Sequence, residues 1–550
     1  MPPTDLKQPT TTTPRPTPTP SLRDPDAIVI GAGPNGLVAA NVLSDAGWDV
    51  LVLEAEAEPG GAVRSGEITV PGFRHDLFSA FYPFSAISPP IIRLALESYG
   101  LRWCRAPLVL GHVFDDGRCA ALSTDEEETA SSVEGFGVGD GAAWRDLVAE
   151  WRRVQDPLVD ALMSPFPPVW PATRLLAKLR TPHAVLDFVR FTLLPVRRLA
   201  AERFRGEGAA MLLAGNTLHT DLGPESAIGG FFAWLLVMLG QTVGFPVPEG
   251  GAAELTNALV RRLESKGGRV QCSQRVNAVL VRQGKAIGVR TAHGTEIVAR
   301  RAVLADVAAP NLFLELVGPE HLPSDFLADL RRFEVDHGTV KVDWALSAPI
   351  PWSDADARRA GTLHVGGGMD HLTEFSAHLA MGRVPPRPFM LMGQMSRADP
   401  TRSPPGTETV WAYSHVPAAT GSEAAAWDEP KTNSFVAGME EEIERRAPGF
   451  GALVLGRHVF TPPDLERADA NLIGGSVNGG TAQIHQQLVF RPTPGRAGAQ
   501  TPVGNLYLAS ASAHPGGGVH GACGANAAAA ALKADRRRRF VGMLSGRPGT

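Results

Sequence analysis

One stretch near the N-terminus constrains the fold more than any other. Residues 28–30 (Ile-Val-Ile) form an apolar run, residues 31–36 carry three glycines, and residues 37–46 show the apolar spacing of a helix. A second apolar run, residues 50–53, ends at Glu54. This order of strand, glycine turn, helix, strand and terminal acid predicts a βαβ unit that binds a dinucleotide.

Each part of this unit has a physical role in the prediction. Gly31 permits the tight turn, Gly33 lets the backbone approach a pyrophosphate, and Gly36 lets the helix pack close to the strand. The amide groups at the helix N-terminus present a partial positive charge to the phosphates. Glu54 stands where a carboxylate can hold ribose hydroxyls, and the same charge disfavours the 2′-phosphate of NADP.

A second glycine motif follows the acid and indicates which dinucleotide is bound. Gly60, Gly61 and Arg64 lie in one short turn segment. This doublet with a nearby arginine resembles the second phosphate clamp of the amine oxidase and phytoene desaturase superfamily of flavoproteins. In that superfamily the doublet approaches the FAD pyrophosphate and the arginine helps to neutralise it. The resemblance therefore implies FAD, and the alternative is a glycine turn that carries a solvent-exposed arginine.

A third glycine motif lies close to the C-terminus. Residues 504–509 have the character of a strand that follows a turn, and residues 526–532 form an alanine-rich helix. The segment between them closely resembles the C-terminal FAD motif of phytoene desaturases, carotenoid isomerases and the pyridine nucleotide-disulfide oxidoreductase domain-containing protein 2 group. The resemblance implies that the flavin end of FAD is bound by Ser510, His514, Gly516, Gly517, Gly518 and Val519.

Two residues of this motif depart from the family pattern. The family often has glycine where this chain has Ser510, and a hydroxyl residue where it has Ala513. The first change tightens the turn, and the second removes a hydrogen bond near the flavin. Neither change abolishes the binding motif, and both bear on catalytic competence.

The resemblance covers separated parts of the chain and therefore implies a discontinuous domain. We expect an α/β fold whose Rossmann-like FAD-binding domain is assembled from residues 25–85, 245–325 and 495–540. Residues 86–244 and 326–494 would form an inserted mixed-sheet and helical substrate domain.

Apolar periodicity and turn residues predict the elements of the inserted regions. Residues 141–239 are expected to be mainly helical, with interruptions at Pro157, residues 165–168 and Pro182. In the second FAD segment, the resemblance implies that the backbone at Val276 binds the adenine edge of FAD. The strands predicted for the substrate domain are residues 108–114, 118–122, 333–346, 389–394, 409–413, 459–463 and 482–488.

Composition and charge exclude several classes of protein. The formal net charge of −5 argues against a nucleic-acid binder, which would carry a basic domain. No apolar run is long enough to span a membrane and no secretory signal is evident, which predicts a cytoplasmic protein. Residues 1–24 are rich in proline and threonine and are expected to be a disordered tail. No metal site is expected, because no CxxC motif or cluster at metal-ligand spacing includes Cys104, Cys119, Cys272 or Cys523.

The candidate catalytic residues are few, because a flavin supplies hydride transfer by itself and the protein has to bind, orient and exclude water. His514 is the first candidate for a polar residue at the flavin, and Lys341 is the second. For His514, a positioning role fits at least as well as proton transfer. His75 would lie near the flavin ring or be a hydrogen-bonded structural histidine, and the structural role is favoured.

We therefore expect an FAD-dependent oxidoreductase, similar to phytoene dehydrogenases, that desaturates or isomerises an apolar, carotenoid-like or other lipophilic substrate. Such a substrate would be drawn from a membrane surface, which the helices of residues 141–239 and the arginines at 536–539 would touch. Two alternatives remain open: a flavin amine or amino-acid oxidase, and a non-catalytic interaction protein that binds FAD. The sequence specifies no oligomeric state.

Overall fold

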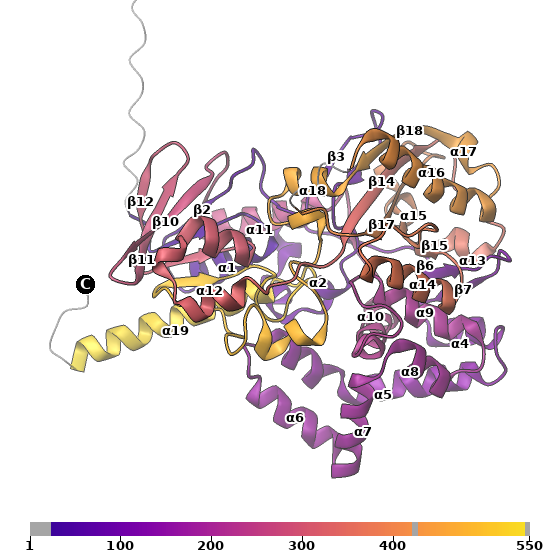
Figure 1. The fold of residues 1–550 in the computed structure, drawn as a ribbon, viewed down its shortest axis with the longest axis horizontal. Coiled ribbons are helices and arrows are strands. Elements are labelled where there is room, and N and C mark those ends of the chain that lie inside the picture. Colours follow the sequence, from indigo (N-terminus) through magenta and orange to yellow (C-terminus); the bar gives the residue numbers. More distant parts are fainter. Residues whose placement is uncertain (1–23, 421–426, 545–550) are drawn as a thin grey trace, which may run out of the picture.

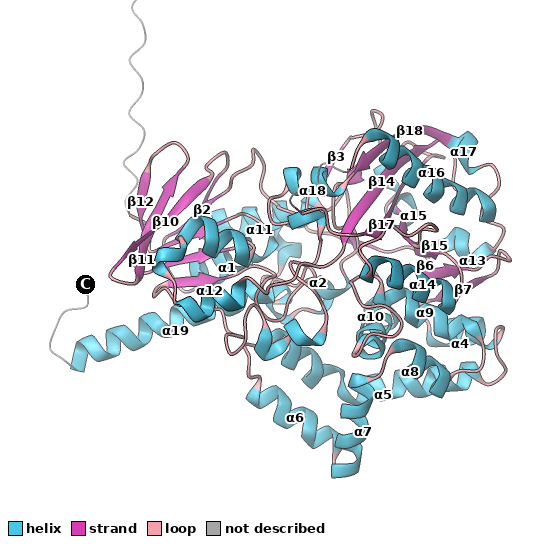
Figure 2. Ribbon diagram, viewed as in Figure 1, coloured by secondary structure: helices cyan, strands magenta, loops and turns pink. Residues whose placement is uncertain are grey.

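The computed structural model describes residues 24–420 and 427–544 of the 550-residue chain. The predicted tail, residues 1–24, lies outside the described part except for Asp24. Two lobes, each centred on a sheet, lie side by side, and a group of helices lies below the right-hand lobe in the view of Figure 1. Figure 2 shows helices packed over the faces of both sheets.

The left-hand lobe is built on a five-stranded sheet with the strand order β19-β13-β1-β2-β9. Every neighbouring pair in it is parallel. β1 and β2 are buried along their whole length, as expected for parallel strands covered on both faces. The strands are Ala27–Ile30 (β1), Val50–Leu53 (β2), Arg269–Gln271 (β9), Ala302–Ala305 (β13) and Leu506–Leu508 (β19).

Different elements cover the two faces of this sheet. On one face, α1 packs against both α11 and α19. On the other face, the antiparallel strands β10, β11 and β12 share a core with Ile28 and Leu51. These elements are Pro34–Asp45 (α1), Ala253–Ser265 (α11), Ala522–Leu544 (α19), Val276–Arg282 (β10), Lys285–Thr291 (β11) and Glu296–Val298 (β12).

The right-hand lobe is built on a seven-stranded mixed sheet with the order β18-β14-β17-β16-β15-β6-β7. Its pairs are antiparallel except for β15 with β6, which confirms the predicted mixed sheet. Apolar side chains of α16 (Glu429–Arg446) cover one face. The strands are Leu108–Val113 (β6), Cys119–Leu122 (β7), Gly338–Leu346 (β14), Ala360–Val365 (β15), Met390–Gln394 (β16), Glu408–Val416 (β17) and Val454–Phe460 (β18).

The sequence analysis missed one strand of this lobe and wrongly predicted another. The central strand β15 was missed, because its sequence Ala-Gly-Thr-Leu-His-Val mixes small, polar and apolar residues without a clear alternation. Residues 482–488 are not a strand but fall in two tight helical turns, Ile484–Gln486 and Leu488–Phe490. Gln486 and Gln487 bind carbonyl oxygens of Glu334 and Thr481 there, so local hydrogen bonds replace a ladder.

The segment predicted to be mainly helical contains helices α5 to α10. Pro157 was predicted to interrupt it, yet α5 continues through this buried proline, because packing of the helix outweighs the loss of one hydrogen bond. The predicted break before Pro182 is present, with the Thr181 hydroxyl accepting from Ala184 and proline in the first turn. The helices are Asp140–Met163 (α5), Val169–Leu179 (α6), Pro182–Leu193 (α7), Val196–Arg203 (α8), Glu207–Thr217 (α9) and Gly229–Val243 (α10).

Short elements complete the fold. They are Ser65–Gly66 (β3), His75–Asp76 (β4), Pro83–Ile87 (α2), Pro89–Ile92 (α3), Trp103–Cys104 (β5), Glu126–Glu134 (α4), Val247–Pro248 (β8), Ser324–Leu330 (α12), Ala355–Arg359 (α13), Met369–Ala380 (α14), Met395–Ala398 (α15), Phe450–Leu453 (α17) and Pro462–Ala468 (α18). Within the described ranges, no helix combines the length and the apolar composition needed to cross a membrane.

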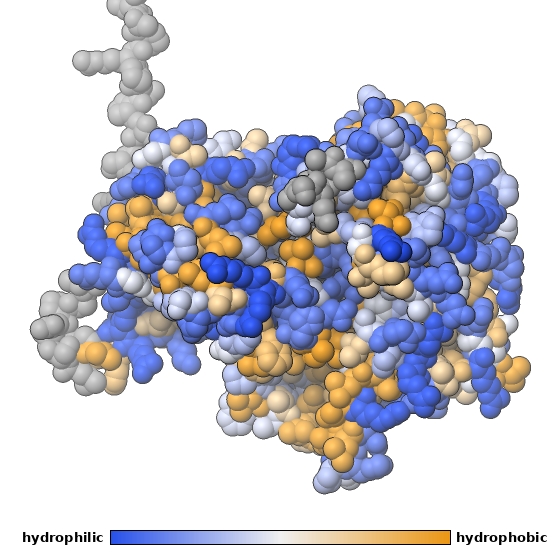
Figure 3. Space-filling view, viewed as in Figure 1, coloured by the Kyte–Doolittle hydropathy of each residue, from blue (hydrophilic) through white to orange (hydrophobic). Residues whose placement is uncertain are grey.

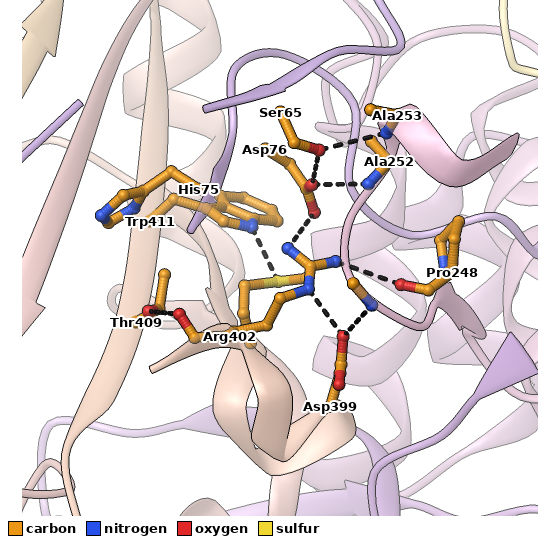
Figure 4. Close-up of polar contacts among 12 residues, drawn as sticks. Ser65, His75, Asp76, Pro248, Ala252, Ala253, Asp399, Arg402, Thr409 and Trp411 are labelled. Carbon is orange, nitrogen blue, oxygen red and sulfur yellow. Dashed lines mark hydrogen bonds and ion pairs between the residues drawn. The ribbon is translucent and has the colours of Figure 1, made fainter. Parts of the chain in front are cut away.

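A buried ion triad joins the two lobes (Figure 4). Arg402 is fully buried and lies 3.0 Å from Asp76 and 2.8 Å from Asp399. Asp76 Oδ1 also accepts a hydrogen bond from the amide of Ala252, and Asp399 Oδ2 accepts one from the amide of Gly250. The triad therefore fastens the loop before α11 in the left-hand lobe, together with the β3–β4 hairpin, to the segment of the right-hand lobe that contains Asp399 and Arg402.

We expect Arg402→Met to lower the free energy of unfolding by about 3–5 kcal/mol, because it leaves two buried carboxylates without their counter-ion. Arg118→Met is the matched control, since it removes an arginine from an exposed pair with Asp116, and it should cost less than about 1 kcal/mol. Urea unfolding followed by tryptophan fluorescence measures both values. Equal losses in the two variants would contradict a role of the triad in holding the lobes together.

Candidate active site

A cavity of about 850 Å³ extends from the left-hand lobe to the helices of residues 140–243. Its walls come from the glycine turn after β1, from one face of β14 and β17, and from helices α5, α7 and α10. Among the predicted cofactor residues, those that line it are Gly31, Gly33, Glu54, Gly61, Arg64, Val276, Ser510, His514, Gly517, Gly518 and Val519. Gly36, Gly60 and Gly516 are not part of the wall.

The glycine turn is shaped by close contacts that exclude side chains. Gly31 has a φ of +91°, and its amide donates to the carbonyl of Leu53 at 2.8 Å. A Cβ atom on Gly36 would lie 2.2 Å from the carbonyl oxygen of Gly31, so only glycine lets α1 start this close to β1. A Cβ on Gly61 would meet the Cα of Gly33 at 3.2 Å, which brings the second glycine motif against the first.

Glu54 lies at the end of β2 and is buried. Its Oε2 atom accepts a hydrogen bond from the amide of Ala32 at 2.7 Å, and Oε1 accepts one from the amide of Glu56 at 2.9 Å. The carboxylate therefore stabilises the glycine turn and also faces the cavity.

Asp306 is a site residue that the sequence analysis did not identify. It follows β13, and its Oδ2 atom accepts a hydrogen bond from the amide of Gly36 at 2.8 Å, at the start of α1. Burial raises the pKa of Asp306 to about 7, and the nearby carboxylates of Asp469 and Glu54 add to the effect. Its position at the carboxyl end of a parallel strand next to β1 was the available signal, since such ends carry binding residues in open α/β sheets.

Arg64 lies across the second glycine motif. Its Nε atom donates to the carbonyl of Gly61 at 2.9 Å, and Nη2 donates to the carbonyl of Ala468 at 2.7 Å. The guanidinium also stacks 5.2 Å from the ring centre of Phe78. These contacts hold the positive charge at the cavity wall, so the arginine is not a free surface residue.

The C-terminal motif forms part of the cavity wall, next to the segment that follows α5. His514 is 5% exposed, and its ring meets that of Phe166 edge-on at 5.8 Å. Burial lowers the pKa of His514 to about 4, so the imidazole is neutral at pH 7. Its Nε2 atom is buried and has no hydrogen-bond partner among the residues that the structure describes. Gly516 supports the loop, since its carbonyl lies 3.2 Å from the Nε2 atom of His520.

Lys341 lies on β14, lines the cavity and forms an ion pair with Asp343. Burial would raise the pKa of Asp343, but the Lys341 ammonium and His75 outweigh it and hold that pKa below its usual range. His75 Nδ1 lies 3.4 Å from Asp343, and His75 Nε2 lies 2.8 Å from the hydroxyl of Thr69. His75 itself does not line the cavity, which agrees with the structural role favoured from the sequence.

Comparison with known proteins identifies the family. A model described as "Flavin containing amine oxidoreductase" matches residues 35–410. The chain belongs to this flavoprotein family. It is therefore an FAD-dependent oxidoreductase, and the predicted family, cofactor and fold class are confirmed.

The flavoprotein resembles curated proteins along most of its length. It is 29% identical to pyridine nucleotide-disulfide oxidoreductase domain-containing protein 2 of Mus musculus, and the match covers 92% of each chain. It is 25% identical to a neurosporene-forming phytoene desaturase of Cereibacter sphaeroides, over 93% of this chain and 95% of that one.

Solved structures share the fold at lower identity. An oxidoreductase from Methanosarcina mazei superposes with a TM-score of 0.60 at 16% identity, over 92% of this chain and 99% of that one. Cyclohexylamine oxidase from Brevibacterium oxydans gives a TM-score of 0.55 at 17% identity, over 94% and 100% of the two chains.

The residues at the nucleotide end of the cavity fit FAD. Gly33 and Gly61 leave backbone without side chains where a pyrophosphate has to approach, at the N-terminus of α1. Arg64 supplies a positive charge beside them, and the loop from Ser510 to Val519 supplies a second backbone surface before α19. Within residues 24–420 and 427–544, no group of histidine, cysteine or carboxylate side chains is arranged to hold a metal ion.

We expect Asp306→Asn to stabilise the flavoprotein more at pH 8 than at pH 5, by about 2.7 kcal/mol, since pH 5 lies two units below the folded pKa and each unit corresponds to about 1.36 kcal/mol. The folded pKa of about 7 exceeds the usual value near 4, so the folded protein keeps a proton that the unfolded chain has lost. The contribution of this carboxyl to stability therefore falls as the pH rises from about 4 to 7. A bound pyrophosphate acts in the same direction, and urea unfolding at the two pH values measures the difference.

The control for this experiment is Asp325→Asn, which changes an exposed carboxylate on α12. It should shift the free energy of unfolding by less than about 0.5 kcal/mol at both pH values. An equal response of the two variants would contradict the elevated pKa of Asp306.

Proposed function

We propose that this FAD-dependent oxidoreductase acts on a lipophilic substrate, from which it removes a hydride and a proton to introduce a carbon–carbon double bond. The observation that supports the proposal is the continuity of one cavity from the glycine turn to an apolar chamber. That chamber is lined by Leu162, Met163, Phe231, Phe232, Leu235 and Leu236. Carotenoid-like and other isoprenoid molecules match such a chamber.

The chain's own residues have limited roles in this reaction. Bound FAD supplies hydride acceptance, and the chamber orients the substrate and excludes water. His514 is neutral and lines the cavity, so it can position the substrate or accept the proton that the substrate loses together with the hydride. Lys341, paired with Asp343, offers a second polar contact at the cavity wall.

The experiment is anaerobic mixing of the purified yellow protein with candidate reductants. We expect isoprenoids, delivered in liposomes, to bleach the flavin absorbance and to gain a double bond, whereas putrescine and cyclohexylamine leave the flavin oxidised. Phe232→Asp places a charge in the apolar chamber and should slow bleaching at least about tenfold with FAD retained. Val138→Asp, which changes an exposed valine outside the cavity lining, is the control.

Other outcomes would replace the proposal. Rapid bleaching by amines with release of hydrogen peroxide would indicate an amine oxidase. A change of double-bond geometry without net oxidation would indicate an isomerase. A flavin that stays oxidised with every reductant would indicate a non-catalytic FAD-binding protein.

The outer surface of the helical region supports a further part of the proposal, contact with a membrane surface. α6 and α7 carry exposed apolar side chains that we call the α6–α7 patch, visible as orange atoms at the lower edge of Figure 3. Leu193 belongs to this patch and also lines the cavity, so the patch lies where a lipophilic substrate would enter. The patch consists of Val169, Trp170, Leu176, Leu186, Val189 and Leu193.

The arginines at 536–539 are a second element of the proposed contact. They lie in the outer half of α19, which extends away from the left-hand lobe in Figure 1. Exposed Phe540 and Met543 follow them on the same helix. Arg539 Nε lies 3.0 Å from Asp535, so part of the positive charge is compensated within the helix.

We expect the protein to float with anionic liposomes, and the double variant Trp170→Asp/Leu186→Asp to lose most of this binding while it keeps FAD. The reason is that insertion of the α6–α7 patch would bury the two new carboxylates in the lipid interface, which is unfavourable. Val138→Asp again serves as the control, because Val138 is 78% exposed and lies outside the patch. Recovery of no wild-type protein with liposomes would refute the membrane contact.

A further inference from the structure

The chamber of the proposed function has two unlike walls. The wall formed by α10 is apolar and presents Phe231, Phe232 and neighbouring leucines. The wall formed by the seven-stranded sheet presents four polar side chains: Thr362 on β15, and the group of three on the paired strands β14 and β17, Thr339, Lys341 and Tyr413. A cavity for a plain hydrocarbon would not need a polar wall.

The three polar residues are neighbours on one face of the sheet. Lys341 on β14 lies directly opposite Tyr413 on β17 in the antiparallel register. Thr339 is two residues before Lys341 on the same strand and therefore points to the same side. Directly opposed side chains of paired strands lie about 5 Å apart, and the next on the strand about 7 Å away, so one small group can reach all three.

Each of the three residues can take part in a new hydrogen bond. The Thr339 hydroxyl is buried and has no hydrogen-bond partner among the described residues. Burial raises the pKa of Tyr413, which keeps its hydroxyl protonated as a donor. The Lys341 ammonium has three N–H donors, and its ion pair with Asp343 does not need all of them.

The net charge of this wall selects among polar groups. Asp343 neutralises Lys341, and His75 fixes Asp343 from behind. A carboxylate would therefore meet a pair of zero net charge, and it would lose its hydration without a free counter-ion. A hydroxyl or carbonyl oxygen loses less hydration and satisfies the unpartnered Thr339 hydroxyl.

We infer that the substrate carries an uncharged oxygen, as a hydroxyl or carbonyl group, that is held by Thr339, Lys341 and Tyr413 while its hydrocarbon body lies against α10. The inference rests on the proposed function, since it specifies the substrate class of the same chamber. It distinguishes oxygenated lipophilic molecules from plain hydrocarbons and from fatty acids.

The test uses purified holoenzyme and three saturated probes of one carbon skeleton: methylcyclohexane, cyclohexylmethanol and cyclohexanecarboxylate. Their dissociation constants are obtained from the perturbation of the flavin absorbance. We expect the wild-type preference for the alcohol over the alkane to fall about fivefold in Thr339→Val and in Tyr413→Phe, because each variant removes one hydrogen bond. Alkane binding and FAD content should stay unchanged.

Ser414→Ala is the matched control. The Ser414 hydroxyl is also buried and unpartnered within the described part of the chain, but its strand position places it on the opposite face of β17 from Tyr413. This variant should leave the preference for the alcohol unchanged.

Two results would overturn the inference and leave the proposed function intact. One is an alcohol preference that is the same in wild type, Thr339→Val and Tyr413→Phe. The other is tighter binding of the carboxylate than of the alcohol, which would assign an anionic head group. If no probe perturbs the flavin and amines reduce it instead, the proposed function fails and the inference fails with it.

Discussion

The two lobes of this flavoprotein depend on the ion triad around Arg402. A guanidinium without exposure to water is stable only where its charge is compensated and its donors are used. Asp76 comes from the β3–β4 hairpin, which follows the second glycine motif, whereas Asp399 and Arg402 come from the right-hand lobe. The backbone amides of Gly250 and Ala252 complete the network, so it joins chain segments that are far apart in sequence.

The position of the cavity follows from this junction. Its nucleotide end is built on the carboxyl ends of β1 and β13, and its chamber lies between the mixed sheet and the helices of residues 140–243. Neither lobe encloses the cavity alone. A change in the angle between the lobes would therefore move Lys341, on β14, relative to the glycine turn after β1.

The sequence alone predicted the parts of the fold that arise from local chemistry. The turn from Gly31 to Gly36 needs a residue without Cβ, and the structure shows the close approach of α1 to β1 that excludes one. The fully apolar strands β1 and β2 could be recognised because both faces of a parallel sheet are covered. The family, the FAD cofactor and the discontinuous α/β fold could be predicted from the three glycine motifs, because each motif depends on residues that are close together in the sequence.

Other features could not be predicted, because they depend on residues that meet only after folding. The sequence of β15 shows no clear alternation of apolar and polar residues, so this segment forms a strand because it pairs with β16 and β6. The position of Asp306 at the end of an apolar strand was visible in the sequence, but its raised pKa was not, because this comes from burial beside Asp469 and Glu54.

The same division holds for the substrate chamber. The sequence showed that residues 141–239 are rich in apolar side chains, which can line a chamber for a lipophilic substrate or form an ordinary core. Only the tertiary structure decided that Thr339, Lys341 and Tyr413 form one polar wall, because strand register and the packing of the sheet against α10 bring them to the cavity.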